Sequence, residues 1–139
     1  MGVEENKASL LRCVEEVWNK GNIELIPEFI SPEYIEPAGD TDIIGLEGIT
    51  QHVTSLRKAF SGFKMTIHEM VCDGDEIAMQ LTWGGTFTEE IWGIKPNNKP
   101  VTIKEAVFIY FKGAKQVKLI CYTHQDTPLF SQMGVNSTN

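Results

Sequence analysis

Residues 63–89 read FKMTIHEMVCDGDEIAMQLTWGGTFTE. The side chains from Phe63 to Cys72 alternate in character, and the Asp73-Gly74-Asp75 that follows is typical of a tight hairpin turn. Glu76–Glu89 is predicted to be a second long strand, which Gly84-Gly85 would bend through a bulge. This stretch therefore predicts two long antiparallel strands joined by a short turn.

Two more strands are predicted after the turn-rich residues 91–100. They cover Val101–Phe111 and Lys115–Gln125, with Lys112-Gly113 as the turn between them. Neighbouring side chains of an extended strand point to opposite faces. The strand Val101–Phe111 is therefore apolar on both faces. One face carries Ile103, Val107, Ile109 and Phe111, and the other carries Ala106, Phe108 and Tyr110.

Three helices are predicted before the strands. Glu4–Lys20 has apolar residues at the spacing of one buried stripe, Asn22–Phe29 is a shorter helix, and Gly48–Phe60 is the third. Residues 31–45 contain several Pro and Gly residues and predict a loop, with a short strand at Tyr34–Glu36. Helices followed by strands predict an α+β fold, with three helices packed on the concave face of a curved antiparallel sheet.

The apolar outer side of the third strand needs a cover that three helices on the other face cannot supply. The simplest cover is the same face of a second copy of the chain. We therefore predict a homodimer formed through the convex face of the sheet, and a large exposed apolar patch when the partner is removed.

The length and composition favour one globular domain over residues 1–139, and the ends, about 1–5 and 135–139, are predicted to be frayed. A net charge of -7 and a pI near 4.9 argue against nucleic acids and anionic membranes, because phosphate binding needs a basic face. No apolar run approaches the roughly 20 residues that span a bilayer. The N-terminus lacks a basic segment followed by an apolar one, so no signal peptide is expected and the protein is predicted to be cytoplasmic.

Neither the cysteines nor the histidines predict a metal site. Three cysteines at wide spacings form no disulfide framework and no CxxC motif, so buried reduced thiols are expected. The histidines show no HxH or HExxH spacing. His52 is expected near the solvated side of the third helix, and His68 on the same face of its strand as Thr66, Met70 and Cys72.

The last predicted strand brings polar groups onto one face. Alternation puts Ile120, Tyr122, His124 and Asp126 together. A carboxylate beside apolar and aromatic groups is partly desolvated, which raises its proton affinity and suits acid/base chemistry. In the alternative interpretation, Asp126 caps the turn before Pro128 and His124 is solvated at the strand end.

Four stretches carry a resemblance to a known family, by their order along the chain. They are NKGNIELIPEFISPEYIEP at 19–37, GLEGI at 45–49, GDEIAMQLTWGGTFTEEIWGIKPNNKPVTI at 74–103 and YTHQDTPLFSQMG at 122–134. Over nearly its whole length the chain resembles the SnoaL-like polyketide (ester) cyclases of the nuclear-transport-factor-2-like superfamily.

The resemblance implies a cone-shaped, cystatin-like α+β barrel with a pocket between the first helices and the concave sheet. It implies an intramolecular aldol closure of an apolar carbonyl compound, without metal or cofactor, and places Asp126 at the position of the family's acid/base aspartate. His124 or Tyr122 would hold the enolate oxygen. The predicted ligand-binding residues are Tyr122, His124, Trp18, Phe87, Trp92 and Phe108.

The sequence also departs from the family pattern. Pro37 stands near a position where relatives commonly carry histidine, and Phe87 replaces the histidine of GTHxG. A module that binds an apolar small molecule without chemistry is therefore the alternative to an enzyme. Hydrolysis of an epoxide is a third option, and would need a second carboxylate. Glu105 and Asp40 are the candidates for it, although Glu105 is expected to face solvent near a strand end.

Overall fold

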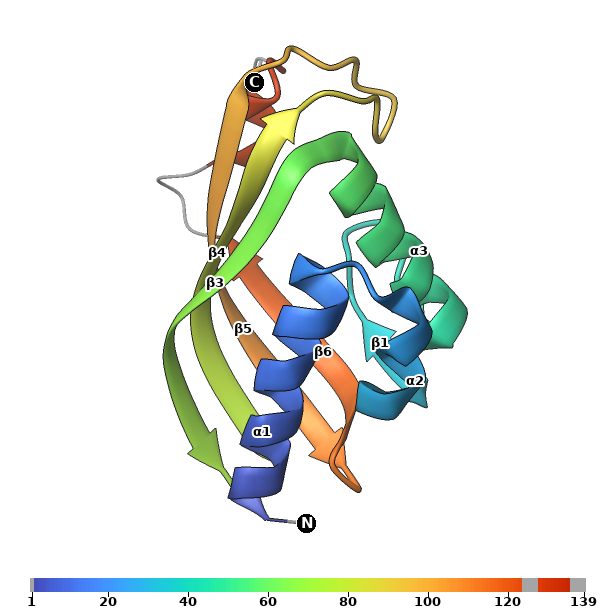
Figure 1. The fold of residues 1–139 in the computed structure, drawn as a ribbon, viewed down its shortest axis with the longest axis vertical. Helices are drawn as coiled ribbons and strands as arrows, with labels where there is room; N and C mark the ends of the chain where they lie inside the picture. Colours follow the sequence, from blue (N-terminus) through green and yellow to red (C-terminus); the bar gives the residue numbers. More distant parts are fainter. Residues whose placement is uncertain (1, 124–127, 136–139) are drawn as a thin grey trace.

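One curved sheet and a layer of helices make up the fold in the computed structural model, which describes residues 2–123 and 128–135. In this part of the chain the sheet has six strands in the order β2-β1-β6-β5-β4-β3 (Figure 1). The strands are β1 (Ile30–Glu36), β2 (Ile43–Ile44), β3 (Phe60–Asp73), β4 (Glu76–Phe87), β5 (Pro100–Lys112) and β6 (Lys115–Thr123).

The helices precede the long strands, apart from one short helix near the C-terminus. They are α1 (Val3–Cys13), the π-helix η1 (Val14–Asn19), the 3-10 turn η2 (Ile23–Leu25), α2 (Ile26–Phe29), α3 (Gly45–Ala59) and α4 (Leu129–Gln132). Among the described residues, none of these helices is long and apolar enough to cross a membrane.

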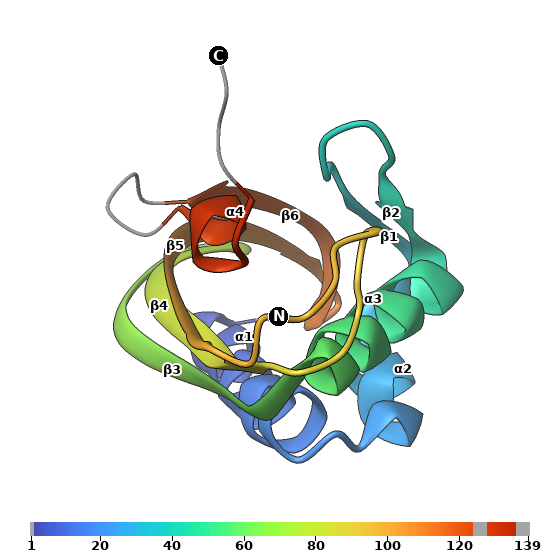
Figure 2. The ribbon, with the colours of Figure 1, turned by 90° about the horizontal axis from the view of Figure 1, so that it is seen from above.

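The predicted α+β class is confirmed. Seen from above, the sheet curves from β3 round to β1, and the N-terminal helices lie across the opening that it leaves (Figure 2). The apolar side chains that fill the space between these layers form two buried clusters, one against β3–β6 and one between β1 and helices α2 and α3.

The strand register separates an inner face from an outer face. On β5 the inward residues Val101, Ile103, Val107, Ile109 and Phe111 are all buried, whereas the outward Ala106, Phe108 and Tyr110 are half-buried. This strand is therefore apolar on both sides, as predicted, and the helices cover only its inner side.

The first strand is longer than predicted and changes the sheet type. β1 covers Ile30–Glu36 and pairs parallel with β6, so the sheet is mixed and not wholly antiparallel. Pro32 favoured a loop in the sequence because proline cannot donate to a strand ladder. In the structure it lies where the β1–β6 register shifts, between Ile30 and Ile35, and the strand accommodates it there.

The first helix is not a single α-helix to Lys20. It continues from Cys13 into a π-helix that ends at Asn19. The Arg57 guanidinium of α3 donates hydrogen bonds to the carbonyl oxygens of Trp18 (2.6 Å) and Asn19 (3.0 Å), which satisfies the orphan carbonyls of this helix end. Gly21 follows with φ of 78°, and a Cβ there would lie 2.6 Å from Arg57 Nε.

The predicted bulge falls on β3 and not on β4. The β4–β5 register runs without a break through Gly84 and Gly85, whereas β3 carries an extra residue between Ser61 and Lys64 and another, His68, between Ile67 and Glu69. The glycines allow close strand approach, since a Cβ on Gly84 would clash with the Val101 carbonyl oxygen. The bulges bend the edge strand over the core.

Candidate functional site

Two polar side chains of β1 point inward. Tyr34 is only 1% exposed, and its hydroxyl donates a hydrogen bond of 2.6 Å to Oε1 of Glu36. Alternation along the strand puts both side chains on the inner face, while Ile35 between them is exposed. The hydrogen bond fixes the Glu36 carboxyl at the end of β1, where the strand pairs with β2.

A second carboxyl lies on the inner face of β5. Glu105 occupies an inward register position between the buried Ile103 and Val107, and it is half-buried. The Trp83 indole N–H and the Cys121 thiol donate hydrogen bonds to it. The expectation that Glu105 faces solvent was therefore wrong, because Glu105 shares the inner face of β5 with Ile103 and Val107 and is contacted there by Trp83 and Cys121.

The surroundings of the two carboxyls set their proton affinities. Burial raises the pKa of Glu36 to about 7; the Tyr34 hydrogen bond opposes the rise, and the negative charge of Glu105 adds to it. Burial also raises the pKa of Glu105, against the stabilising hydrogen bonds from Trp83 and Cys121. The negative charge of Glu105 disfavours a second negative charge on Glu36, so the two carboxyls resist ionising together.

Aromatic rings line the interior beside these carboxyls. Trp18 of η1 stacks on Phe63 at a centroid distance of 5.8 Å, and Phe63 stacks on Trp83 at 5.7 Å. Phe60 packs between Trp83 (5.3 Å) and Phe87 (5.4 Å). The rings form a continuous apolar wall from the π-helix across β3 and β4, and this wall keeps water from the neighbouring polar groups.

His52 belongs to this interior and not to the solvated side of α3. Its ring packs edge-on against Trp18 at 5.9 Å, and burial lowers its pKa to about 4. It is one turn from the buried Ile49 and Leu56 in the stripe that α3 turns toward the core. His52 is therefore neutral at physiological pH.

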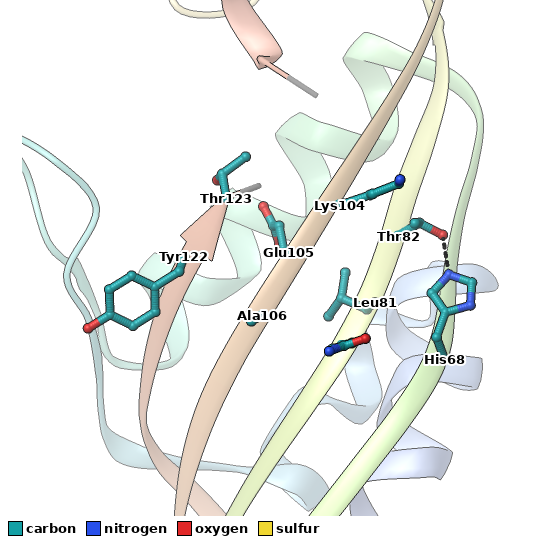
Figure 3. A pocket seen from close by; sticks show the side chains of 9 residues that line it. His68, Leu81, Thr82, Lys104, Glu105, Ala106, Tyr122 and Thr123 are labelled. Atoms are coloured by element: carbon teal, nitrogen blue, oxygen red, sulfur yellow. Dashed lines mark hydrogen bonds between the residues drawn. The ribbon is translucent and has the colours of Figure 1, made fainter. Parts of the chain in front are cut away.

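A hollow of about 660 Å³ lies beside the end of β6, and residues from both faces of the sheet line it (Figure 3). Its wall includes His68, whose Nε2 lies 3.0 Å from the Thr82 hydroxyl. The bulge at His68 separates it from Met70 and Cys72, which return to the inner face, so the predicted shared face was wrong for these two residues, whereas Thr66 lies on the outer face with His68. At the other side of the hollow, the Glu105 carboxyl points toward Thr123 at the end of β6.

The sequence matches the SnoaL-like polyketide cyclase family over residues 8–120. The chain belongs to the SnoaL-like polyketide cyclase family. No curated protein matches it significantly. Family membership supports a cyclase-like function in general, and members of this family typically bind small molecules.

Solved structures share this architecture over almost the full chain. A protein described as a polyketide cyclase from Acidithiobacillus ferrooxidans is 26% identical, with a TM-score of 0.78 over 96% of this chain and 98% of that one. A protein described as SnoaL-like from Jannaschia sp. CCS1 is 14% identical, with a TM-score of 0.84 over 96% and 94%. A protein with a ketosteroid isomerase-like fold from Catenulispora acidiphila, solved with trimethylamine, is 15% identical, with a TM-score of 0.72 over 92% and 93%.

The structure disperses the residues that were predicted to bind ligand in this SnoaL-like chain. Trp18 and Phe87 lie in the interior wall, whereas Phe108 and Tyr122 meet edge-on at 6.0 Å on the outer face, with Tyr122 60% exposed. Trp92 is exposed on the β4–β5 connection and packs against Phe130. Asp126 and His124 lie outside the described residues.

Glu36 was assigned no role from the sequence, and Glu105 was named only as a candidate second carboxylate that was expected to face solvent. The sequence contains a signal that could have identified Glu105. It is an acidic residue that lies between Ile103 and Val107 in the series of alternating apolar residues that face inward. Glu36 ends the short strand that was predicted at Tyr34–Glu36, but Pro32 and Pro37 predict a loop on either side, so the face on which its side chain lies could not be assigned. Among the described residues, no three His, Cys, Asp or Glu side chains are grouped as metal ligands would be.

Proposed function

We propose that this chain is a cofactor-independent enzyme that performs acid/base chemistry on a small apolar carbonyl compound, by intramolecular aldol cyclisation or a related isomerisation. The observation that carries this proposal is the pair of half-buried carboxyls, Glu36 and Glu105, on an inner face walled by aromatic rings. Membership of the SnoaL-like family supports the cyclase-like reaction class.

The chemistry begins with removal of a proton from a carbon next to a carbonyl. A carboxylate deprived of water is a stronger base, and hydrogen-bond donors held in a dry site stabilise the enolate oxygen that forms. Asp126, which the resemblance places at the position of the acid/base aspartate, is the proposed base. An apolar interior favours substrates whose remaining surface is apolar.

Deuterium exchange tests this proposal without knowledge of the natural substrate. The ketone 1-tetralone would be incubated with the protein in D₂O, and loss of its α-proton signal followed by proton NMR. We expect exchange faster than in buffer alone, because reversible enolisation is the first step of both proposed reactions. Quenching of tryptophan fluorescence would report binding separately. A protein that binds the ketone and leaves its exchange rate unchanged would contradict the proposal.

Replacing the proposed base gives the first specific prediction. Asp126→Asn should lower the exchange rate at least about 10²-fold, because an amide cannot accept the carbon-bound proton. Asp42→Asn, at an exposed position of the loop before β2, is the matched control and should exchange as the unmodified chain does. Equal rates for the Asp126→Asn variant and the unmodified chain would remove Asp126 from the mechanism.

A binding module is the second candidate, and the aromatic wall is the observation that favours it. Phe87 is fully buried against Phe60, and neither ring can transfer a proton. A chain of this kind would hold an apolar compound and release it unchanged. The fluorescence and exchange measurements separate the two candidates, since only the enzyme changes the ketone.

A further inference from the structure

The two interior carboxyls differ in the number of donors that each receives. The Glu105 carboxyl accepts from the Trp83 indole and the Cys121 thiol, whereas Glu36 accepts from Tyr34 alone. We propose that Glu36 and Glu105 act as a pair that holds one proton, and that Glu36 donates this proton to the carbonyl oxygen of the substrate. This inference rests on the proposed function and names the proton donor that completes it.

The geometry around Glu36 selects one oxygen for the proton. The Tyr34 hydroxyl donates to Oε1 over 2.6 Å, so Oε1 is an acceptor and Oε2 is left to carry the acidic proton. Tyr34 is itself immobilised, because it is buried in the cluster formed by β1 and helices α2 and α3. The carboxyl is therefore oriented before a substrate arrives, which is the requirement for an efficient donor.

The charges facing Glu36 explain why the pair keeps one proton. Among the described residues, the ionisable groups that act on it are Tyr34 of its own strand and Glu105 of β5. Cys121 of β6 and Cys13 of α1 both act on Tyr34, but burial raises the pKa of both thiols and leaves them neutral. Two carboxylates in one dry site repel each other, so ionised Glu105 favours protonated Glu36.

The proposed reaction balances without an oxidant or reductant. The base takes the proton of the α-carbon, the electron pair of that bond forms the enol double bond, and the carbonyl oxygen takes the proton of Glu36. In the closure, the enol carbon forms a bond to a second carbonyl carbon, and the enol proton returns to Glu36. The second carbonyl oxygen takes the proton held by the base, so the product is a hydroxyketone.

The dependence of the ketone exchange on pH tests this role. Glu36 must carry its proton to act, so kcat/KM for exchange of 1-tetralone should fall as the pH rises through about 7. Glu36→Gln should abolish this fall in kcat/KM, which is the alkaline limb of the pH profile. The same variant should have a kcat/KM about 10²-fold lower at pH 6. Glu105→Gln removes the repelling charge and should move the limb to lower pH. Tyr34→Phe removes a donor to the carboxylate and should move it to higher pH.

Controls separate a failure of this inference from a variant that does not fold and from a failure of the proposed function. Glu76→Gln, at an exposed position of β4, should leave the limb in place. Carboxyl carbon NMR of the unmodified chain should show Glu36 titrating near 7, and a midpoint at the ordinary value of about 4.3 would overturn the inference even if a variant fails to fold. An inactive unmodified chain contradicts the proposed function. An active one whose Glu36→Gln variant keeps the same limb contradicts this inference alone.

Discussion

Glu36 is held inside the protein at a cost to folding. The unfolded chain exposes this carboxyl, which then ionises near its ordinary pKa of about 4.3. In the folded chain, burial raises the pKa of Glu36 to about 7. A raised carboxyl pKa means that the folded state binds more protons, so its contribution to stability is fully present below the unfolded pKa and is lost as the pH rises through 7.

Removing this carboxyl should therefore stabilise the protein at alkaline pH. The difference between a pKa of about 4.3 and one of about 7 corresponds to about 3.7 kcal/mol, so the free energy of unfolding of Glu36→Gln relative to the unmodified chain should rise by up to about 3.5 kcal/mol between pH 4 and pH 8. Urea unfolding at both pH values measures the difference. Glu33→Gln, at an exposed position of the same strand, is the control. A difference that does not change with pH would contradict the buried, protonated state of Glu36.

Side-chain amides join two of the helical segments to strand edges that lack a neighbour. Asn19 at the end of η1 exchanges hydrogen bonds with the backbone of Met65 on edge strand β3, at 2.9 and 2.7 Å. Gln132 of α4 does the same with Thr102 of β5, at 2.8 and 2.9 Å, beyond the point where β6 ends. Each amide imitates one residue of a neighbouring strand and satisfies backbone groups that would otherwise be unpaired.

The link between α4 and β5 can be tested alone. Gln132→Ala removes two hydrogen bonds, each of which contributes about 1 kcal/mol. The free energy of unfolding should therefore fall by about 2 kcal/mol, and the Thr102 amide should exchange with deuterium faster. Ser131→Ala, at an exposed neighbouring position, should change neither. Unchanged protection of Thr102 would show that the amide pairing does not hold α4 in place.

Strands and turns that are indicated by a pattern of neighbouring residues could be predicted from the sequence. The alternation of β3, β4 and β5 and the Asp-Gly turn indicated these strands and their antiparallel pairing. The parallel pairing of β1 with β6 joins residues about eighty positions apart, and Pro32 obscured it locally. The extra residues of β3 were also missed, because Gly84 and Gly85 indicate close approach without indicating which strand carries the bulge.

The candidate site was harder to predict than the fold because it depends on which face each strand turns inward. Alternation grouped Tyr122 with the proposed pocket, yet β6 turns Leu119 and Cys121 inward and leaves Tyr122 outside. A one-residue change of register exchanges every inner and outer side chain, and no local signal in the strand fixes it. Glu105 is a different case: alternation groups it correctly with Ile103 and Val107, but it was expected to face solvent near a strand end.

At the scale of the whole molecule, the outer face of the sheet carries apolar groups with no helix over them. Ala78, Phe108 and Ile120 lie opposite one another on β4, β5 and β6. Tyr122 extends this row at 60% exposure, and Val71 of β3 is 62% exposed. An aligned apolar row across several strands is the surface on which a second sheet packs, so this face supports the predicted homodimer.

We expect the unmodified chain to sediment as a dimer and Phe108→Glu to sediment as a monomer, because a charge at the centre of a packed apolar interface is costly to bury. Ile44→Glu is the matched control, since Ile44 on β2 is 64% exposed and lies away from this row. Some of the residues that line the hollow, His68 and Tyr122 among them, are on the same face, so a partner would cover them. Cross-linking or light scattering at several concentrations would measure the mass. A monomeric unmodified chain, or a Phe108→Glu variant that stays dimeric, would mean that this face is left to solvent or to another ligand.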